Sequence, residues 1–426
     1  MTLSRQDCLA LDAADPLAHL REQFQLPEGV NYLDGNSLGV LPSATASRVA
    51  QVILEEWGNG LIRSWNSAGW ITLPQRVGDK IAHLVGAQPG ELVVADSTSL
   101  NLYKVLSAAL SIARADHPER KVILSERSNF PTDLYMAQSL AAQYGMTLKL
   151  TTAEALAQDL NEEVAVLMLT HVNYRNGRMF DMAAVTAQAH AVGALTVWDL
   201  AHSAGAVPVE LNGAQADFAI GCGYKYLNGG PGAPAFVWAH PRHADRFWQP
   251  LSGWMGHAHP FTFDTQYAPA KGISRYLCGT PAVLAMSALE CGVDTLLAAE
   301  PQGGMAALRA KSLQLTDLFI TQVRERCAAH ALPVVTPAEH GVRGSQVSLA
   351  CPQYGYAVMQ ALIARGVIGD FRAGDGTAAE PDLLRFGFTP LYVRFVDVYD
   401  AVTALATVLD SGEWREARFN QKAAVT

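Results

Sequence analysis

The sequence lacks the features that mark membrane-spanning, exported and nucleic-acid-binding proteins. No segment of the 426 residues reaches the roughly 18 uninterrupted apolar positions of a membrane span, and residues 1–15 hold no apolar stretch behind a basic start. No run of like charges occurs, and the formal net charge of −9 argues against nucleic acid and anionic membrane surfaces as partners. We therefore expect a cytoplasmic protein that binds a small molecule.

The six cysteines are scattered, without a close pair or the spacing of metal ligands. This distribution predicts neither a disulfide framework nor a zinc site, and we expect no metal. Internal repeats and low-complexity segments are also missing. In contrast, hydrophobic residues make up 50% of the chain, enough for a sizeable core. The length favours a large domain with a second, smaller one.

Between residues 90 and 240, short β-rich runs alternate with amphipathic helical patterns. The candidate strands are 91–96, 121–126, 146–151, 164–172, 195–199, 218–222 and 233–239. Strands that are apolar on both faces and separated by helices indicate a mostly parallel sheet covered on both sides. The predicted fold class is therefore α/β, a three-layer domain around a mainly parallel sheet.

Beyond Pro301 the pattern changes to that of a smaller α+β domain. It predicts helices over 305–330, 356–365 and 396–409, with the strand-like runs QVSLACP, VIGDFR and LLRFGF between them. We divide the chain into an N-terminal segment (1–60) that contributes to the small domain or to an interface, a large domain (61–300) and a small domain (301–426).

Polar clusters follow the candidate strands, at the edge where ligands bind in such sheets. Asp199 ends the buried run LTVWD. It either caps a following helix or holds a cation inside a pocket, where a low dielectric strengthens the pairing. His202 follows three residues later and would reach the same ligand. In the cluster GCGYKYLNGGPG, Lys225 stands between two tyrosines, which favours a pocket over solvent.

A desolvated lysine has a lowered pKa and forms a Schiff base with an aldehyde. Lys225 and an acid at a ring nitrogen are together the two groups that pyridoxal phosphate requires. A helix beginning at Thr98 or Ser99 would offer N–H groups and hydroxyls to the phosphate, unless these residues serve only as ordinary caps. Phe130 is either a ring-stacking residue or part of the core.

These motifs give the chain a family resemblance over nearly its whole length. It resembles the fold type I pyridoxal-phosphate enzymes of the class V aminotransferase group and, within them, the kynureninases. The matching motifs are YLDGNSLG (32–39), GWITLP (69–74), STSLNLY (97–103), NFPTD (129–133), DLAHSAG (199–205), YKYLNGGPG (224–232), GWMGH (253–257) and LRFGFTPLY (384–392). The aspartate and lysine pair is shared by the broad group, whereas GNSLG, FPTD, YKYLN and GWMGH are more particular.

The resemblance implies a role for each matching residue. Lys225 would bond to the cofactor, Asp199 would pair with its ring nitrogen, and Tyr224 would deliver protons or hold the phosphate. The other cofactor contacts that it implies are Thr98, Ser99, Phe130, Pro131, Thr132, Asp133, Thr170, His202, Trp254 and Thr280.

For the substrate, the resemblance implies Arg385 as a two-pronged clamp on an α-carboxylate, with Trp65 and Ser37 as further contacts. Arg385 read by itself could also be a surface residue of an edge strand. Trp65 could equally be a core or interface aromatic.

The implied activity is hydrolysis of the β–γ carbon bond of L-kynurenine to anthranilate and L-alanine, in tryptophan catabolism. The 3-hydroxylated substrate is a second possibility, and the residues near the aromatic end favour the unmodified one. The resemblance also implies a homodimer with shared active sites. Two alternatives stay open: a cysteine desulfurase, for which Cys351 is the candidate nucleophile, and a cofactor-free binding protein of the same fold.

Overall fold

The computed structural model describes residues 3–377 and 380–422. The chain forms two compact units, one of Ala44–Tyr174 and Phe180–Asp294, the other of Met1–Ser43, Arg175–Met179 and Thr295–Thr426. The division at residues 60 and 300 stays a prediction from the sequence. The predicted ranges 1–60 and 301–426 include residues 1–2, 378–379 and 423–426, which lie outside the described residues.

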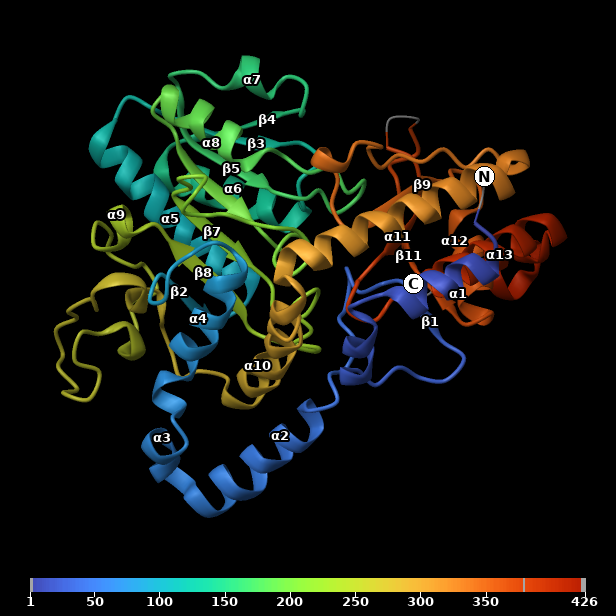
Figure 1. The fold of residues 1–426 in the computed structure, drawn as a ribbon. Coiled ribbons are helices and arrows are strands. Elements are labelled where there is room, and N and C mark those ends of the chain that lie inside the picture. The colour runs from blue at the N-terminus through green and yellow to red at the C-terminus, as the bar shows by residue number, and fades with distance from the viewer. Residues whose placement is uncertain (1–2, 378–379, 423–426) are drawn as a thin grey trace. The chain divides into compact units, whose positions relative to one another are not determined.

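Within the described residues, seven strands form the sheet of the first unit (Figure 1). Its order is β2-β8-β7-β6-β5-β3-β4, and only β8 runs antiparallel to its neighbours. The strands are β2 (Leu92–Ala95), β3 (Val122–Glu126), β4 (Thr147–Thr151), β5 (Val164–Thr170), β6 (Leu195–Asp199), β7 (Phe218–Gly221) and β8 (Ala235–Ala239). The predicted α/β class with a mainly parallel sheet is thus confirmed.

Helices cover both faces of this sheet, which explains why β5 and β6 are apolar on both sides. Val197 of β6 belongs to the apolar cluster shared with α5, whereas the indole of Trp198 donates to Thr186 Oγ1 of α8 at 3.2 Å. The helices of this unit are α2 (Thr45–Gln51), α3 (Ser64–Ser67), α4 (Leu73–Leu84), α5 (Thr98–Asp116), α6 (Pro131–Tyr144), α7 (Leu156–Asp159), α8 (Met182–Ala191), α9 (Pro241–Ala244) and α10 (Val283–Leu297), the last of which continues past Asp294.

Local sequence sets the ends of the helices that begin at the sheet edge. Ser97 caps α5 by accepting from the Leu100 N–H at 3.4 Å. Pro131 occupies the first turn of α6, where its missing N–H costs nothing. Gly145 ends α6 with a φ of 66°, a left-handed conformation that glycine adopts without strain. The start of α5 is thereby fixed at Thr98, one of the two positions predicted.

The second unit holds an antiparallel sheet of order β11-β12-β9 and a parallel pair, β1-β10. Its strands are β1 (Asn31–Tyr32), β9 (Gln346–Ala350), β10 (Val367–Ile368), β11 (Asp370–Arg372) and β12 (Leu383–Gly387). Its helices are α1 (Arg5–Ala14), α11 (Gly304–Arg326), α12 (Gly355–Ala364) and α13 (Phe395–Ser411). The three helices predicted beyond Pro301 are present, and β12 is the middle strand of its sheet.

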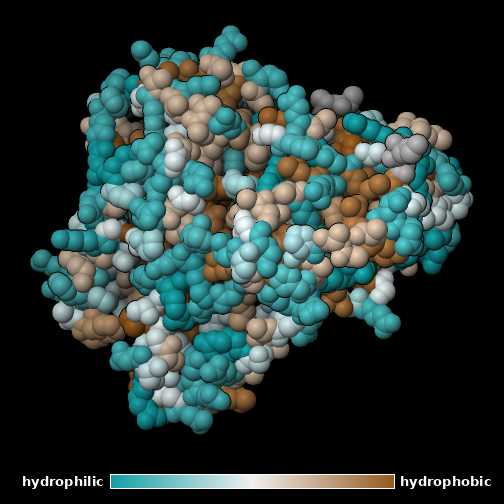
Figure 2. All heavy atoms as spheres, in the orientation of Figure 1, coloured by the Kyte–Doolittle hydropathy of each residue, from teal (hydrophilic) through white to brown (hydrophobic). Residues whose placement is uncertain are grey.

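The surface is mixed. On the face drawn in Figure 2, apolar residues lie scattered among hydrophilic ones. Among the described residues, no helix has the length and apolar character needed to cross a membrane.

Candidate active site

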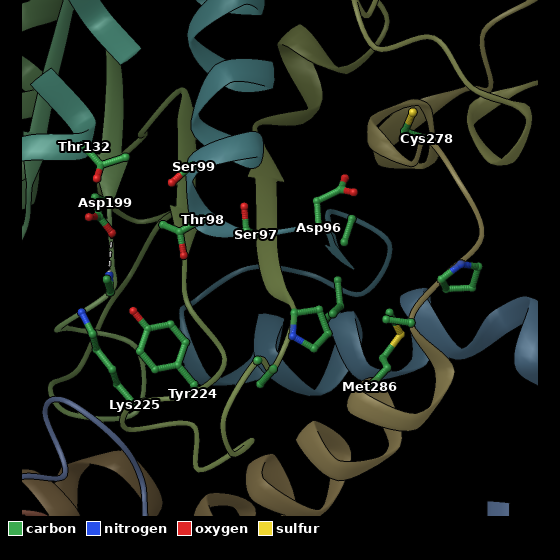
Figure 3. A pocket seen from close by; sticks show the side chains of 18 of the residues that line it. Asp96, Ser97, Thr98, Ser99, Thr132, Asp199, Tyr224, Lys225, Cys278 and Met286 are labelled. Carbon is green, nitrogen blue, oxygen red and sulfur yellow. Dashed lines mark hydrogen bonds between the residues drawn. The ribbon is translucent and has the colours of Figure 1, made fainter. Parts of the chain in front are cut away.

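A cavity of about 580 Å³ lies in the first unit, where the loops after several strands meet. Asp199 and Lys225 lie on one side of it, while Asp96, Cys278 and Met286 lie on the other (Figure 3). Eleven residues predicted from the sequence line it: Thr98, Ser99, Phe130, Thr132, Asp133, Thr170, Asp199, His202, Tyr224, Lys225 and Thr280.

Two buried carboxyl groups form the acidic end of this cavity. Asp199 is the last residue of β6, and Asp133 lies in the first turn of α6. Asp199 Oδ1 accepts from the Ala201 N–H at 2.7 Å, but no helix follows, so the simple helix-cap alternative fails. Burial raises the pKa of both groups, and the neighbouring charge of Asp199 raises that of Asp133 further. The two carboxyl groups are therefore stabilised when they share a proton or when a cationic hydrogen-bond donor lies beside them.

Lys225 supplies the positive charge that faces this pair. It lies in the loop after β7, and its charge opposes the rise in the pKa of both Asp199 and Asp133. Its Nζ is 3.0 Å from His202 Nε2 and 5.6 Å from the ring centre of Tyr224. His202 therefore contacts the lysine in addition to following Asp199 in the chain, which places a proton-transfer partner beside the lysine nitrogen.

The start of α5 forms another part of the cavity wall, with Thr98 and Ser99 in its first turn. Both residues face the cavity together with Thr280. The N–H groups of a first helical turn lack partners within the helix and carry partial positive charge, which suits an anion. This wall has the chemistry of a phosphate site.

An exposed aromatic ring lies at the mouth of the cavity. Phe130 precedes α6, is 41% exposed, and meets Tyr174 edge to face at 5.2 Å. Thr170, the last residue of β5, donates to Asn129 Oδ1, which also accepts from the Phe130 N–H at 2.7 Å. Hydrogen bonds thus fix the backbone that presents Phe130, and its open face is available to a flat ring.

Some predicted residues lie elsewhere. Pro131, Trp65 and Trp254 do not line this cavity, although they belong to the same unit. Trp65 packs edge to face against Trp254 at 5.9 Å and against Trp70 at 6.4 Å. Trp65 therefore lies in a cluster of three tryptophans, and its assignment to the substrate stays a prediction.

Ser37 and Arg385 belong to the second unit, and Arg385 Nη2 donates a hydrogen bond to Ser37 Oγ at 2.7 Å. The same nitrogen is 2.6 Å from Asp370 Oδ2, and Arg385 is only 1% exposed. The alternative of a surface arginine on an edge strand is therefore wrong. Burial and the charge of Asp370 raise the pKa of nearby Asp34 to about 7.

Sequence reasoning missed several lining residues, among them Asp96, Ser97, Tyr174, Cys278 and Met286. Asp96 and Ser97 could have been predicted, because both stand in the polar run DSTS (96–99) at the end of the candidate strand 91–96. Tyr174 lies in the polar run THVNYRNG (170–177) at the end of β5, and an aromatic residue at a strand end was the usable signal. Nothing in the local pattern singles out Cys278 or Met286.

The residues present fit pyridoxal phosphate. Asp133 Oδ2 is buried and has no hydrogen-bond partner among the described residues, so a protonated ring nitrogen would complete the acidic pair. Lys225 faces that pair, and the first turn of α5 suits the phosphate. Among the described residues, no group of three or more His, Cys, Asp or Glu side chains could hold a metal ion.

Comparison with solved structures defines the class. The fold is similar to that of the apo cysteine desulfurase from Thermococcus onnurineus NA1, with a TM-score of 0.77 and 19% identity over 92% of this chain and 98% of that one. It is also similar to a C-DES mutant that carries glycine covalently linked to its PLP cofactor, with a TM-score of 0.78 and 17% identity over 91% and 98%. The chain thus has the fold of pyridoxal-phosphate enzymes related to cysteine desulfurases.

Sequence comparison narrows this class to one family. Residues 308–405 match the model of the kynureninase C-terminal domain. The chain is 58% identical to a kynureninase of Pseudomonas fluorescens and 56% identical to one of Burkholderia pseudomallei, each over 99% of this chain and 100% of the relative. The chain belongs to the kynureninase family.

Proposed function

We propose that this protein hydrolyses the β–γ carbon bond of L-kynurenine, giving anthranilate and L-alanine, with pyridoxal phosphate as its cofactor. The observation that carries the proposal is the contact of Lys225 with His202, opposite the buried Asp133 and Asp199 pair, in a member of the kynureninase family. The cavity of about 580 Å³ has room for a cofactor of this size with a small amino acid.

Each wall of the cavity has a part in holding the cofactor. Asp199 and Asp133 would hold the ring nitrogen in its protonated form, Phe130 would stack on the ring, and Thr98, Ser99 and Thr280 would bind the phosphate. When bound, pyridoxal phosphate supplies an electron-accepting ring that stabilises negative charge next to the substrate nitrogen. The buried acids make this possible because a neutral ring nitrogen accepts charge poorly.

We assign the proton transfers to the side chains of Lys225, His202 and Tyr224. Lys225 Nζ is the base that would take the proton from the substrate α-carbon. His202 Nε2 lies 3.0 Å from that nitrogen and holds it in place for the transfer. Tyr224 lies beside Lys225 and is our candidate for proton delivery after water has added to the γ-carbonyl and the β–γ bond has broken. One water is consumed, and its oxygen leaves in the carboxylate of anthranilate.

Arg385 is the proposed ligand of the substrate α-carboxylate, with Ser37 beside it. The geometry that supports this is a guanidinium held by Asp370 and Ser37 on the middle strand of a sheet, where its orientation is fixed. Trp65 is proposed for the aromatic end of the substrate, for which its packing on Trp254 supplies a rigid apolar surface. We expect unmodified L-kynurenine to be preferred over its 3-hydroxy analogue.

The desulfurase alternative needs an accessible thiolate, and Cys351 does not supply one. It directly follows β9 and is 1% exposed, and burial raises the pKa of its thiol to about 12. The likeness to desulfurases, at 17–19% identity, is a likeness of fold.

We also propose a homodimer. The helical segment of residues 52–62 exposes a series of large apolar side chains, with Leu54 67%, Trp57 58%, Leu61 57% and Ile62 77% exposed. Several exposed large apolar side chains within one short helical segment favour a protein partner, and a second copy of the chain is the simplest one. Replacement of Ile62 by Glu should shift the mass measured by light scattering from dimer toward monomer, whereas a parent protein that is already monomeric would contradict the proposal.

The activity is tested by incubating the cofactor-loaded protein separately with L-kynurenine, 3-hydroxy-L-kynurenine and L-cysteine. We expect anthranilate from the first, less 3-hydroxyanthranilate from the second, and no sulfide from the third. Sulfide release that is lost in Cys351→Ser would establish the desulfurase alternative instead. A colourless protein whose absorbance pyridoxal phosphate leaves unchanged would establish the cofactor-free one.

A further inference from the structure

One carboxylate lies on the wall of the cavity that suits an anion. Asp96 directly follows β2 and precedes Ser97, the cap of α5, and it lines the cavity beside Thr98 and Ser99 (Figure 3). Its φ of 46° is left-handed, a conformation that residues other than glycine seldom adopt unless their surroundings hold them in it. A fixed negative charge here would repel a phosphate dianion.

Lys104 provides the compensating charge from behind this wall. It lies in α5, its side chain is 0% exposed, and its Nζ forms an ion pair with Asp96 Oδ2. The neighbouring positions of the helix, Leu102, Val105 and Leu106, are also fully buried and apolar. An apolar residue would satisfy packing alone at position 104, because burial of an ammonium group is unfavourable unless it is paired. The charge of Lys104 therefore requires a reason beyond packing.

The same ammonium group also joins two walls of the cavity. Besides Asp96, Lys104 Nζ donates to the carbonyl oxygen of Tyr276 at 2.5 Å. Tyr276 ends a short helical turn and leads directly into Leu277–Thr280, which lines the cavity. Lys104 thus holds both the segment before Thr98 and the segment before Thr280, the hydroxyl residues that we assign to the phosphate.

We propose that Lys104 is a positioning residue for the cofactor phosphate, which acts by neutralising Asp96 and by fixing the segments that carry Thr98 and Thr280. This proposal rests on the assignment of the phosphate to that wall under the proposed function. Lys104 itself touches neither the cofactor nor the substrate. Its contribution is to the affinity for the phosphate group and not to the chemistry at Lys225.

The test compares pyridoxal phosphate with pyridoxal, which lacks the phosphate. Cofactor is removed, and the dissociation constant of each compound is measured by absorbance or fluorescence titration. Lys104→Met leaves Asp96 uncompensated and should weaken pyridoxal phosphate binding roughly 10-fold or more, with a much smaller effect on pyridoxal. The double variant Lys104→Met with Asp96→Asn should recover the part of the lost affinity that is due to the uncompensated charge of Asp96, and not the part due to the lost bond to Tyr276.

Asp96→Asn alone keeps the shape of the side chain and provides a decisive variant should Lys104→Met fold poorly. It leaves the Lys104 charge near the phosphate, so it should leave pyridoxal phosphate affinity unchanged or raise it. A purely structural role for the ion pair predicts the opposite, a loss of affinity for both compounds, and that result would overturn the proposal. A parent protein that binds no pyridoxal phosphate would overturn the proposed function as well, whereas normal binding by the parent and by Lys104→Met would overturn only this inference.

Discussion

Asp217 anchors the strand that carries Asp199, and its replacement by Asn should strongly destabilise the first unit. The Asp217 carboxylate is 1% exposed and lies 2.8 Å from a ring nitrogen of His190, 2.8 Å from one of His243 and 2.6 Å from Arg242 Nη2. It also accepts from the Thr196 N–H at 2.8 Å near the start of β6. The two carboxylate oxygens of Asp217 therefore link α8, α9 and β6 by hydrogen bonds and ion pairs.

The size of the expected destabilisation follows from the loss of a buried negative charge that is surrounded by several hydrogen-bond donors. Breaking such a network typically costs about 3–5 kcal/mol, because the remaining charge is left without its partner. We expect Asp217→Asn to lower the free energy of unfolding by about this amount, or the melting temperature by roughly 6–20 °C for a domain of this size. Urea titration at neutral pH, followed by tryptophan fluorescence, reports on this region because Trp198 and Trp238 are buried in the same sheet.

Dependence on pH provides a second signature. The hydrogen bonds from His190, His243 and Arg242 hold the pKa of Asp217 well below its usual range. A lowered pKa in the folded protein means that the stabilisation is complete above the unfolded pKa of about 4 and is lost as the pH falls below it. The difference between the parent and Asp217→Asn should thus shrink as the pH falls below about 4.

Asp294 provides the matched control. Its carboxylate is 2.7 Å from Lys80 Nζ, but its side chain is 51% exposed, so Asp294→Asn should change the stability by less than about 1 kcal/mol. If Asp217→Asn cost no more than this control, the account of a buried anchoring network would be refuted.

Three further predictions concern the site itself. Replacement of Arg385 by Lys should raise KM for L-kynurenine about 100-fold through loss of the two-pronged pair, and an equal loss of cofactor affinity in a binding titration would contradict the clamp. Asp199→Asn should lower kcat at least about 100-fold while the cofactor still binds, and an unchanged kcat would show that the ring nitrogen needs no acid there. Phe130→Leu should weaken cofactor binding about 2- to 12-fold, which is the affinity that one stacked pair of aromatic rings contributes. An unchanged dissociation constant in the titration would exclude stacking.

The sequence was sufficient to predict the central sheet, because strands buried on both faces are continuously apolar and contrast with the helices between them. The cavity was largely predictable for a related reason. Asp199, Thr170 and Lys225 lie at or just after the carboxyl ends of parallel strands, where topology brings distant residues together.

What could not be predicted depends on pairings between distant segments. Arg385 was ambiguous because only the register of β12 between β11 and β9 makes its strand central. Lys104 resembled an ordinary helical lysine, since nothing local indicates that its ammonium group reaches Asp96 and Tyr276. Trp65 was ambiguous because its neighbours Trp70 and Trp254 come from separate turns, one of them nearly two hundred positions away along the chain.

The most direct test of the central claim is the product stoichiometry of the cofactor-loaded protein with L-kynurenine. Anthranilate and L-alanine are quantified in the same reaction mixture, for the parent and for Lys225→Ala reconstituted with pyridoxal phosphate. We predict one anthranilate and one L-alanine for each L-kynurenine consumed, and turnover in the variant reduced by several orders of magnitude. Consumption of L-kynurenine without equal amounts of the two products, or undiminished turnover by Lys225→Ala, would contradict the account.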